Sequence, residues 1–497
     1  MTTVAPHEAE SPLILTIDAG SSSARALLFD ARGRAVDGVS AQERYSVHTT
    51  DAGASEDDPD TALERIARCV DAALAQAGPL AGKIGGVALD TLVTNMLAID
   101  AAGRPLTPLI TYADTRAADA EDLRRRMDEH AVHERTGCML RVSYWPARLA
   151  WFRRTQPEVW RAASRWITLG EYLELRLFGR GRVSYSVASW SGLLDRRRLE
   201  WDAPLLEAVG LATEQLGPLV DLDEPLHGLA APYAARWSVL RDVPWFPAIG
   251  DGAAANVGSG CTGHDRMAVT IGTTGAVRVV QDDVPRVPEG LWCYRVDRRW
   301  ALFGGATSEG GNVYAWMRAT LRLDEPEAIE RTLETLPPDG HGLTVLPFLA
   351  GERSPGWAGD ARAAISGLTL ATTPVQILQA SLEAVVYRFA LIEERICGQG
   401  DCPHRLVASG GALLSSPAWM RIVADALGRP VVASAEPEAT SRGVALLALR
   451  SLGAIASLDA VPAADGEVYE PDPARHAVYR AAIERQRELY GMLVARQ

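Results

Sequence analysis

The stretch Leu13-Ile-Leu-Thr-Ile-Asp-Ala-Gly-Ser-Ser-Ser-Ala-Arg-Ala-Leu-Leu-Phe29 decides the fold of this chain. It predicts two apolar strands joined by a tight turn that is rich in small hydroxyl residues. Glycine allows the backbone to approach a ligand closely, and successive backbone N–H groups at such a turn can hold an anion. The carboxylate of Asp18, at the entrance of the turn, is a ligand type that suits a magnesium ion.

A second copy of this pattern lies far downstream, in Ala268-Val-Thr-Ile-Gly-Thr-Thr-Gly-Ala-Val-Arg-Val-Val280. It again places a turn of glycine and hydroxyl residues between two apolar strands. Two phosphate-type hairpins, one in each half of the chain, predict a duplicated nucleotide-binding fold with ATP between the halves.

The segment after the first hairpin predicts a strand over 35–45, a helix that starts near Asp57–Asp60, and a buried strand over 84–90. This order is typical of a ribonuclease-H-like domain, whereas a Rossmann unit would place a helix directly after the glycine loop. We expect an α/β protein with a flexible terminus over 1–12, a first domain over 13–260 and a second over 261–497. The two domains should pack around a cleft.

Charge and lysine content exclude several classes of protein. The 497 residues carry a net charge of −13, and no basic run stands out, which argues against electrostatic binding of nucleic acid. Lys83 is the only lysine, and Ile84 follows it, so the chain has no Walker P-loop. Metal, backbone N–H groups and arginine must therefore meet the phosphate charge.

The cysteines and the hydropathy pattern indicate a cytoplasmic protein. The six cysteines form no C-x-x-C pair, and we expect reduced thiols, including Cys397 and Cys402. The first twelve residues contain acidic residues and no apolar core, unlike a signal peptide. No continuous apolar stretch predicts a membrane span.

Five separated motifs together resemble one family, the FGGY carbohydrate kinases of the actin-like ATPase superfamily. These are the two hairpins, Gly250-Asp251-Gly252, Ser409-Gly-Gly-Ala412 with Ser415, and Gly304-Gly-Ala306 followed by Gly310-Gly311 and Trp316. The resemblance runs from about residue 13 to about residue 450, in the order of the family. Within it, residues 105–116 and 351–357 look most similar to gluconokinases.

The resemblance implies transfer of the γ-phosphoryl group of ATP to a hydroxyl of a sugar acid, with gluconate first and a ketose or polyol such as xylulose as the alternative. It implies two ribonuclease-H-like, actin-like domains, the first binding sugar and the second nucleotide. Asp251 would be the general base and Asp18 would hold Mg²⁺. The residues implied at the nucleotide are Gly20, Ser21, Ser22, Ser23, Arg25, Gly272, Thr273, Thr274, Gly311, Gly410, Gly411 and Ser415.

The substrate side departs from the pattern of the family. Thr94 stands where relatives carry histidine, although Thr94 and Asn95 can still bind hydroxyls. Tyr112 replaces a tryptophan, while Asp114 and Arg116 are retained. We expect Thr94, Asn95, Tyr112, Asp114 and Asp251 to contact the acceptor.

Two other readings of the chain remain open. A non-catalytic sensor of sugar or nucleotide on the same fold fits the altered Thr94 region, whereas the presence of both Asp18 and Asp251 argues against it. A chaperone-type ATPase shares the duplicated fold, but residues 112–116 and 352–355 favour a small-molecule kinase. Helical surfaces in both halves are compatible with a homodimer.

Overall fold

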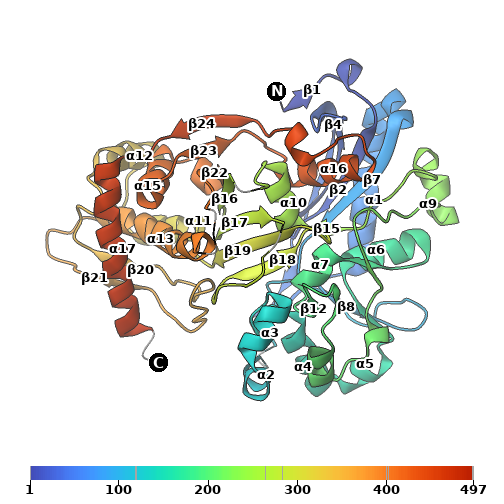
Figure 1. The fold of residues 1–497 in the computed structure, drawn as a ribbon, viewed down its shortest axis with the longest axis horizontal. Helices are drawn as coiled ribbons and strands as arrows, with labels where there is room; N and C mark the ends of the chain where they lie inside the picture. Colours follow the sequence, from blue (N-terminus) through green and yellow to red (C-terminus); the bar gives the residue numbers. More distant parts are fainter. Residues whose placement is uncertain are drawn as a thin grey trace.

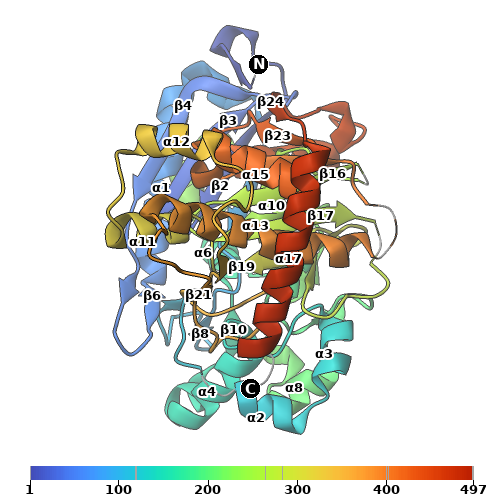
Figure 2. The same ribbon diagram turned by 90° about the vertical axis from the view of Figure 1, so that its left-hand side faces the viewer.

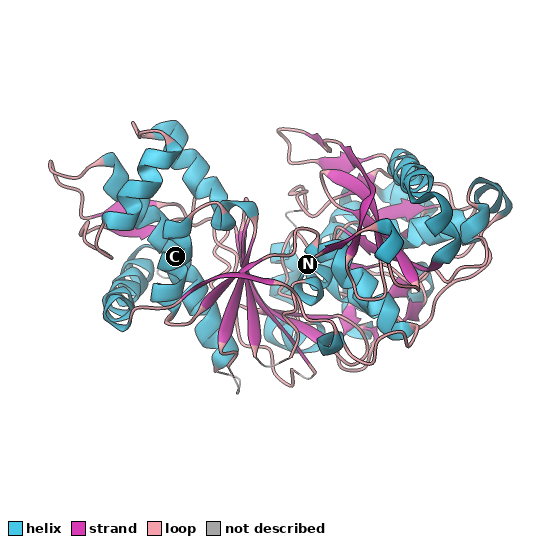
Figure 3. Ribbon diagram, turned by 90° about the horizontal axis from the view of Figure 1, so that it is seen from above, coloured by secondary structure: helices cyan, strands magenta, loops and turns pink. Residues whose placement is uncertain are grey.

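The structure is a computed structural model that describes residues 2–494 except 118, 119, 264, 283, 399 and 401. Each half of the chain is built on one large mixed sheet covered by helices, and the two halves lie side by side (Figure 1; Figure 3 shows them from above). This arrangement confirms the predicted two-domain α/β architecture.

The first sheet has the order β1-β4-β3-β2-β7-β15. Its strands are β1 (Thr3–Val4), β2 (Leu13–Ala19), β3 (Ser23–Phe29), β4 (Ala35–Arg44), β7 (Ile84–Thr91) and β15 (Ile249–Gly250). Helices of this half are α1 (Pro59–Ala77), α2 (Ala120–Arg126), α3 (Glu129–Thr136), α4 (Trp145–Thr155), α5 (Pro157–Ala162), α6 (Leu169–Phe178), α7 (Tyr185–Trp190), α8 (Ala203–Val209), α9 (Ala231–Arg236) and α10 (Asp251–Gly258).

The second sheet has the order β18-β19-β17-β16-β22-β23-β24. Its strands are β16 (Arg266–Ile271), β17 (Gly275–Gln281), β18 (Trp292–Arg295), β19 (Ala301–Thr307), β22 (Arg405–Ser409), β23 (Val431–Ser434) and β24 (Asp465–Tyr469). Helices of this half are α11 (Gly311–Thr320), α12 (Pro326–Thr335), α13 (Pro374–Cys397), α14 (Gly411–Leu414), α15 (Pro417–Leu427), α16 (Ala439–Ser451) and α17 (Pro473–Leu493).

Short strands form small sheets at the periphery. β8 (Leu97–Ile99) pairs with β10 (Arg165–Ile167), and β5 (His48–Thr49), β6 (Ser55–Asp57) and β9 (Leu109–Ile110) form a three-stranded sheet. The remaining pairs are β11 (Val183–Ser184) with β14 (Leu219–Val220), β12 (Leu194–Asp195) with β13 (Glu200–Trp201), and β20 (Thr344–Leu346) with β21 (Ala364–Ser366).

The two predicted hairpins have matching surroundings. β2 pairs antiparallel with β3 and parallel with β7, just as β16 pairs antiparallel with β17 and parallel with β22. Each hairpin turn therefore lies beside the carboxyl end of a parallel neighbour. Ligands of open α/β sheets bind at such ends, so both turns are placed to face a ligand.

Helix α13 is the central helix of the second half. It is long and apolar enough to cross a membrane by length and composition, but 83% of its most apolar window is buried inside the protein. Such burial is what the core helix of a globular domain shows. Helix α17 lies across α13 and α15 on the outer side of this half (Figure 2).

Helix α16 belongs to the second half by sequence but contacts β2 and β7 of the first sheet (Figure 1). It also packs against α10, and the two helices approach closely through glycines. A Cβ on Gly443 would lie 1.9 Å from the carbonyl oxygen of Ala254, and one on Gly258 would lie 1.7 Å from that of Ala439. Side chains of both halves consequently share one hydrophobic core, which includes Ile14, Phe29, Ile249, Val257, Leu302, Val444 and Leu447.

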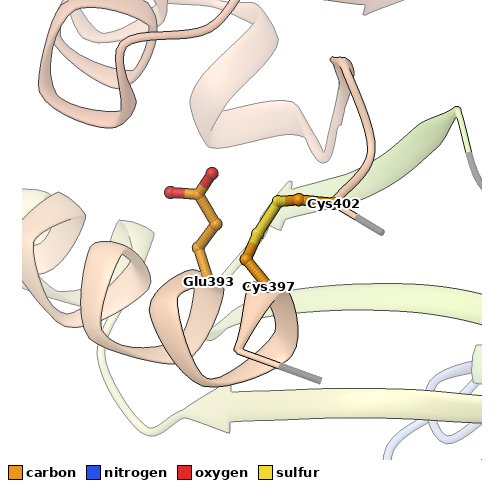
Figure 4. A group of neighbouring side chains, drawn as sticks. All are labelled: Glu393, Cys397 and Cys402. Atoms are coloured by element: carbon orange, nitrogen blue, oxygen red, sulfur yellow. A yellow bond between two sulfur atoms is a disulfide. The ribbon is translucent and has the colours of Figure 1, made fainter. Parts of the chain in front are cut away.

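Two local expectations differ from the structure. The first residues are packed rather than free, because Thr3 and Val4 pair in parallel with Ala35 and Val36 and Val4 is buried. Cys397 and Cys402 are not reduced thiols but form a disulfide beside Glu393 (Figure 4). The turn between α13 and β22 brings these two sulfur atoms together, which sequence spacing alone does not reveal.

Candidate active site

A cavity of about 830 Å³ lies between the two halves of the chain. Six of the predicted site residues line it: Ser21, Thr94, Tyr112, Asp114, Asp251 and Thr274. The cavity is therefore made of both domains, as a site for transfer between two bound molecules requires.

Three carboxylates gather at the carboxyl ends of three adjacent parallel strands. Asp18 on β2 is the register partner of Asp90 on β7, so their side chains share one face of the sheet. Asp90 is in turn the register partner of Ile249 on β15, two residues before Asp251. Sequence reasoning identified Asp18 and Asp251 but missed Asp90, which lacks a neighbouring glycine or hydroxyl turn; its only signal is its place at the end of a buried strand.

Burial and mutual repulsion disfavour ionisation of this cluster. Burial raises the pKa of Asp90 well above its ordinary value, and the charges of Asp18 and Asp251 raise it further. Burial also raises the pKa of Asp18, which the positive charge of Arg25 partly opposes. Both carboxylate oxygens of Asp90 are buried, and among the described residues their side-chain neighbour for a hydrogen bond is another carboxyl group, Asp18. A buried carboxylate beside another carboxyl group is costly, so this geometry favours a cation or proton beside it.

Asp251 occupies the first position of α10, directly after β15. One of its carboxylate oxygens, Oδ1, accepts a hydrogen bond from the backbone N–H of Gly252 at 2.7 Å. Burial raises the pKa of Asp251 to about 6, and the nearby positive charge of Arg278 opposes this rise. A carboxyl group with such a pKa is well matched to accept a proton near neutral pH.

Two arginines lie near the carboxylates, and the one predicted from the sequence is not the one that lines the cavity. Arg25 was predicted to contact phosphate, but its Nη1 is 2.7 Å from a carboxylate oxygen of Glu438 and it does not line the cavity. Arg278, which sequence reasoning missed, lines the cavity instead. Its guanidinium donates to Thr270 Oγ1 at 2.9 Å and to the Gly252 carbonyl at 3.3 Å.

The first hairpin turn is held by hydrogen bonds from its own backbone and from Tyr45. The N–H of Gly20 donates to the Ser23 carbonyl at 3.1 Å, the N–H of Tyr45 donates to the Ser22 carbonyl at 2.9 Å, and the Tyr45 hydroxyl donates to the Gly20 carbonyl. Ser21 reaches the cavity, Ser22 is exposed and Ser23 is buried. The turn is therefore preorganised, and Ser21 and Ser22 are its accessible hydroxyls.

The predicted nucleotide-side glycines lie in three loops that meet beside β16. The N–H of Gly311 donates to the Gly272 carbonyl at 2.8 Å, and the N–H of Asn312 donates to the Thr273 carbonyl at 3.1 Å. Gly410 has a φ of 91°, and a Cβ there would lie 2.4 Å from the Ile271 carbonyl oxygen. A Cβ at Gly311 or Gly410 would overlap neighbouring backbone atoms, so these positions require glycine.

Gly272 and Gly411 differ from those glycines, because a Cβ on either would meet no atom within 4 Å. They face open space, which a bound ligand can enter. Ser415 ends α14, where its hydroxyl donates to the Ala412 carbonyl at 3.1 Å. Among the residues of the second half that were predicted to contact the nucleotide, only Thr274 lines the cavity between the halves.

Thr94 has a strained backbone. Its φ is 54°, a left-handed conformation that β-branched residues rarely adopt. Arg148, which is buried, donates from Nη1 to the Thr94 carbonyl and from Nη2 to the Thr111 carbonyl at 2.8 Å. The Thr94 hydroxyl is buried without a partner although the residue lines the cavity. Such strain is typical of functional positions, where surrounding contacts hold it in place.

The other predicted substrate residues divide into two groups. Asp114 and Tyr112 line the cavity, with Asp114 2.6 Å from Arg116 in an ion pair and Tyr112 half exposed. Asn95 does not reach the cavity and is fully buried. Its side chain donates to the Leu92 carbonyl and accepts from the N–H of Leu169 at 2.7 Å, so it joins two segments of the fold instead of binding substrate.

Four aromatic side chains line the cavity and are called the aromatic wall here; the tryptophan-rich sequence pointed to Trp190 as one ring that could face a sugar, but not to the other three. It consists of Trp190, Trp292, Tyr294 and Trp357. The rings of Trp190 and Tyr294 are stacked with centroids 3.6 Å apart, and those of Trp292 and Tyr294 are 4.7 Å apart. Aromatic faces of this kind exclude water and pack well against apolar C–H surfaces.

Two hairpin-bearing domains around a cavity with a buried carboxylate cluster define a class, the phosphotransferases that act on a small acceptor. Profiles of the family of FGGY carbohydrate kinases match residues 13–258 for the N-terminal domain and 267–452 for the C-terminal domain. The chain belongs to this family. It is therefore a carbohydrate kinase, a phosphotransferase with an alcohol group as acceptor.

Relatives of known name support the same family. The chain is 28% identical to a gluconokinase of Bacillus subtilis over 93% of its own length and 91% of that protein. It is 26% identical to a xylulose kinase of Escherichia coli, covering 97% and 99% of the two chains. The solved structure of a ligand-bound xylulose kinase from Lactobacillus acidophilus superposes with a TM-score of 0.90 at 25% identity, over 97% of this chain and 98% of that one.

Proposed function

We propose that this protein transfers the γ-phosphoryl group of ATP to a hydroxyl of a sugar acid, with gluconate as the acceptor. The observation that carries the proposal is the cavity between the halves, which is lined by Asp251, by arginines and by aromatic rings. The full-length similarity to gluconokinases supports the choice of acceptor.

Asp251 is the general base of the proposed reaction. Its carboxylate accepts the proton of the attacking hydroxyl, while the hydrogen bond from the Gly252 N–H holds one oxygen in place. Positioned proton transfer of this kind contributes typically ~10²–10⁴ in rate. The cationic Arg278 beside it stabilises the negative charge that this carboxylate carries before the proton arrives.

The residues at the ends of β2 and β7 fit a divalent cation. The two oxygens of Asp90 are buried, and the carboxyl group of Asp18 lies beside them on the same face of the sheet. Carboxylate oxygens are the ligands that Mg²⁺ takes in phosphoryl-transfer sites. We therefore propose that Asp18 and Asp90 hold Mg²⁺, which would neutralise charge on the phosphate oxygens.

The nucleotide is proposed to lie against the second domain. Gly272, Thr273 and Thr274 would face the phosphates across from Gly20, Ser21, Ser22 and Ser23. Gly311, Gly410, Gly411 and Ser415 would border the adenosine, and the open space over Gly272 and Gly411 supports this placement. The hairpin turns contribute backbone N–H groups, the type of anion ligand that a lysine-poor chain requires.

A ketose or polyol acceptor, such as xylulose, is the second candidate. It is favoured by the similarity to xylulose kinases and by Thr94, which offers a hydroxyl rather than a charged group to the cavity. A non-catalytic sensor would bind ligands in the same cavity without turnover, but the intact carboxylate cluster argues for catalysis.

The test is release of ADP from MgATP with a panel of gluconate, xylulose, ribulose, erythritol and glycerol. We expect the highest kcat/KM with gluconate. A preference for a neutral member of the panel would replace the sugar acid by the ketose or polyol candidate. Binding of ATP without ADP release on any acceptor would favour the sensor.

We also propose a division near residue 260 into a sugar-binding and a nucleotide-binding domain, a cytoplasmic location, and a homodimer. The boundary is supported by the gap between the two family profiles. Light scattering of the purified chain would measure its oligomeric state.

A further inference from the structure

The loop between β20 and β21 carries two neighbouring charged residues, Glu352 and Arg353, and both line the cavity between the halves. Glu352 is buried, forms an ion pair with Arg388, and accepts a hydrogen bond from the Tyr490 hydroxyl at 2.6 Å. Its negative charge is therefore matched inside the second domain. Arg353, the next residue, lines the cavity between the halves.

Arg353 differs from the other arginines of the cavity in its contacts within the described part of the chain. Among residues 2–494 that the structure describes, no carboxylate forms an ion pair with its guanidinium, and the guanidinium makes no hydrogen bond. The other cationic groups of the cavity differ in this respect: Arg141 contacts Glu129, and Arg278 donates to Thr270 and Gly252. In a chain with a net charge of −13, an unpaired arginine facing a cavity is notable because acidic partners are abundant.

The backbone that carries Arg353 is held from several sides. The N–H of Ser354 donates to the Ala306 carbonyl at 3.0 Å, and the indole N–H of Trp357 donates to the Gly290 carbonyl at 2.8 Å. The N–H of Trp357 also donates to the Arg353 carbonyl at 2.6 Å. Because the loop is fixed, its backbone keeps the Arg353 side chain at the cavity.

Two tyrosine hydroxyls and a second arginine lie in the surroundings of Arg353, and such groups suit a sugar acid. The Tyr144 and Tyr294 hydroxyls are bonded to each other at 2.5 Å, and the positive charge of Arg353 acts on both phenol groups. The Arg141 guanidinium lies over the Trp357 ring, 5.6 Å from its centroid. A second cation thus stands near the same loop.

The aromatic wall, Arg353 and Asp251 all line the same cavity. Trp190 stacks on Tyr294 on one side and borders Gly250 and Gly252, the neighbours of Asp251, on the other. An acceptor with a negative charge would be attracted to the positive charge of Arg353, whereas the carboxyl cluster already disfavours further negative charge beside it. Such an acceptor would bind with its carboxylate at Arg353 and its reacting hydroxyl at Asp251.

We infer that Arg353 is the specificity residue that binds the carboxylate of the acceptor, with Arg141 as a secondary cation. This inference rests on the proposed function and adds the group that distinguishes a sugar acid from a neutral sugar. The guanidinium is suited to the task because its planar N–H groups match the two oxygens of a carboxylate.

The experiment measures binding of gluconate and of glucitol, its neutral counterpart, by calorimetry, together with kcat/KM for gluconate. Arg353→Gln should weaken gluconate binding by roughly 10–100-fold, the effect of losing a charge-assisted hydrogen bond, with little change for glucitol. Arg353→Lys should recover part of the loss. Arg362→Gln is the matched control, because Arg362 is exposed on the same loop and bonds only to the Asp360 and Ala361 carbonyls.

Two failures can be told apart. If the wild-type protein prefers a neutral acceptor, the proposed substrate is wrong before any variant is compared. If the wild type prefers gluconate but folded Arg353→Gln binds it within about twofold of wild type, the role of Arg353 is overturned while the proposed function stands. Thermal unfolding identifies variants that are folded.

Discussion

Asp251 is the residue on which turnover should depend most. Asp251→Asn keeps the size of the side chain and an oxygen that can accept the Gly252 N–H, but it removes the basic carboxylate. We expect kcat to fall by ~10²–10⁴ with ATP affinity nearly unchanged, since proton acceptance is lost and the nucleotide side is untouched. Steady-state kinetics with nucleotide titration checks this, and an active Asp251→Asn protein would remove Asp251 as the base.

Asp90 should control the affinity for the divalent cation. Replacing it with asparagine removes a carboxyl group that could carry a negative charge against a bound cation, so cation binding should weaken by roughly 10-fold or more. Binding of Mn²⁺ followed by electron paramagnetic resonance reports this without turnover. Asp100→Asn is a suitable control, because Asp100 pairs with Arg104 in an exposed turn. Equal Mn²⁺ affinity in wild type and Asp90→Asn would exclude Asp90 from the cation site.

Which site residues could be predicted from sequence depends on how local their signals are. Asp18 and Asp251 stand near glycines in short motifs. The structure places Asp18 near the end of β2 and Asp251, which lines the cavity, at the start of α10. Asp90 lies in no such motif. Arg278 and Arg353 lie within quoted segments, but their place at the cavity becomes visible only when distant strands pair and the halves meet. Asn95 is the opposite case. Its segment suggested substrate binding, but its side chain makes hydrogen bonds inside the fold instead.

At the scale of single elements, the start of α6 holds a carboxyl group whose charge opposes folding. Thr168 and Glu171 form a capping box, in which one Glu171 oxygen accepts the Thr168 N–H at 2.7 Å and the other, buried, has no partner. Burial raises the pKa of Glu171 to about 7.

Because this pKa is raised in the folded state, the unfolded chain ionises first as pH increases. The free energy of unfolding should therefore fall between about pH 4.5, the ordinary value of a glutamate, and about pH 7. Glu171→Gln keeps the cap and removes the charge, so it should stabilise the protein by up to about 3 kcal/mol at pH 8 and by little at pH 4. Denaturant unfolding at both pH values measures the difference, with the exposed Glu158→Gln as control. A Glu171→Gln effect that is the same at both pH values would contradict a buried, neutral Glu171.

The elements themselves were largely predictable. The hairpins, α1, α13 and α15 follow from apolar periodicity and clear end signals such as Asp58, whose carboxylate accepts the Thr61 N–H at 2.7 Å. The position of α16 was not predictable in this way, because its amphipathic sequence does not say which of two sheets it covers.

At the scale of the whole molecule, stability should be most sensitive to substitutions in the contact between α10 and α16. A methyl group on Gly443 would overlap the Ala254 carbonyl, so Gly443→Ala should destabilise the protein by about 1–3 kcal/mol. Gly491→Ala in α17 is the matched control: a Cβ there meets nothing within 4 Å, and alanine favours the helix. Calorimetric melting compares the two. An unchanged Tm for Gly443→Ala would show that the helices can separate at no cost.

The return of α16 to the first sheet also has a consequence for biosynthesis. When α10 leaves the ribosome, its partner helix is still about 190 residues from being made. At translation rates of roughly 5–20 residues per second, the first half waits some tens of seconds with an apolar face uncovered. The nascent chain therefore passes through a stage in which it needs protection from aggregation, by chaperones or by dilution, and slow codons before residue 451 would lengthen that stage.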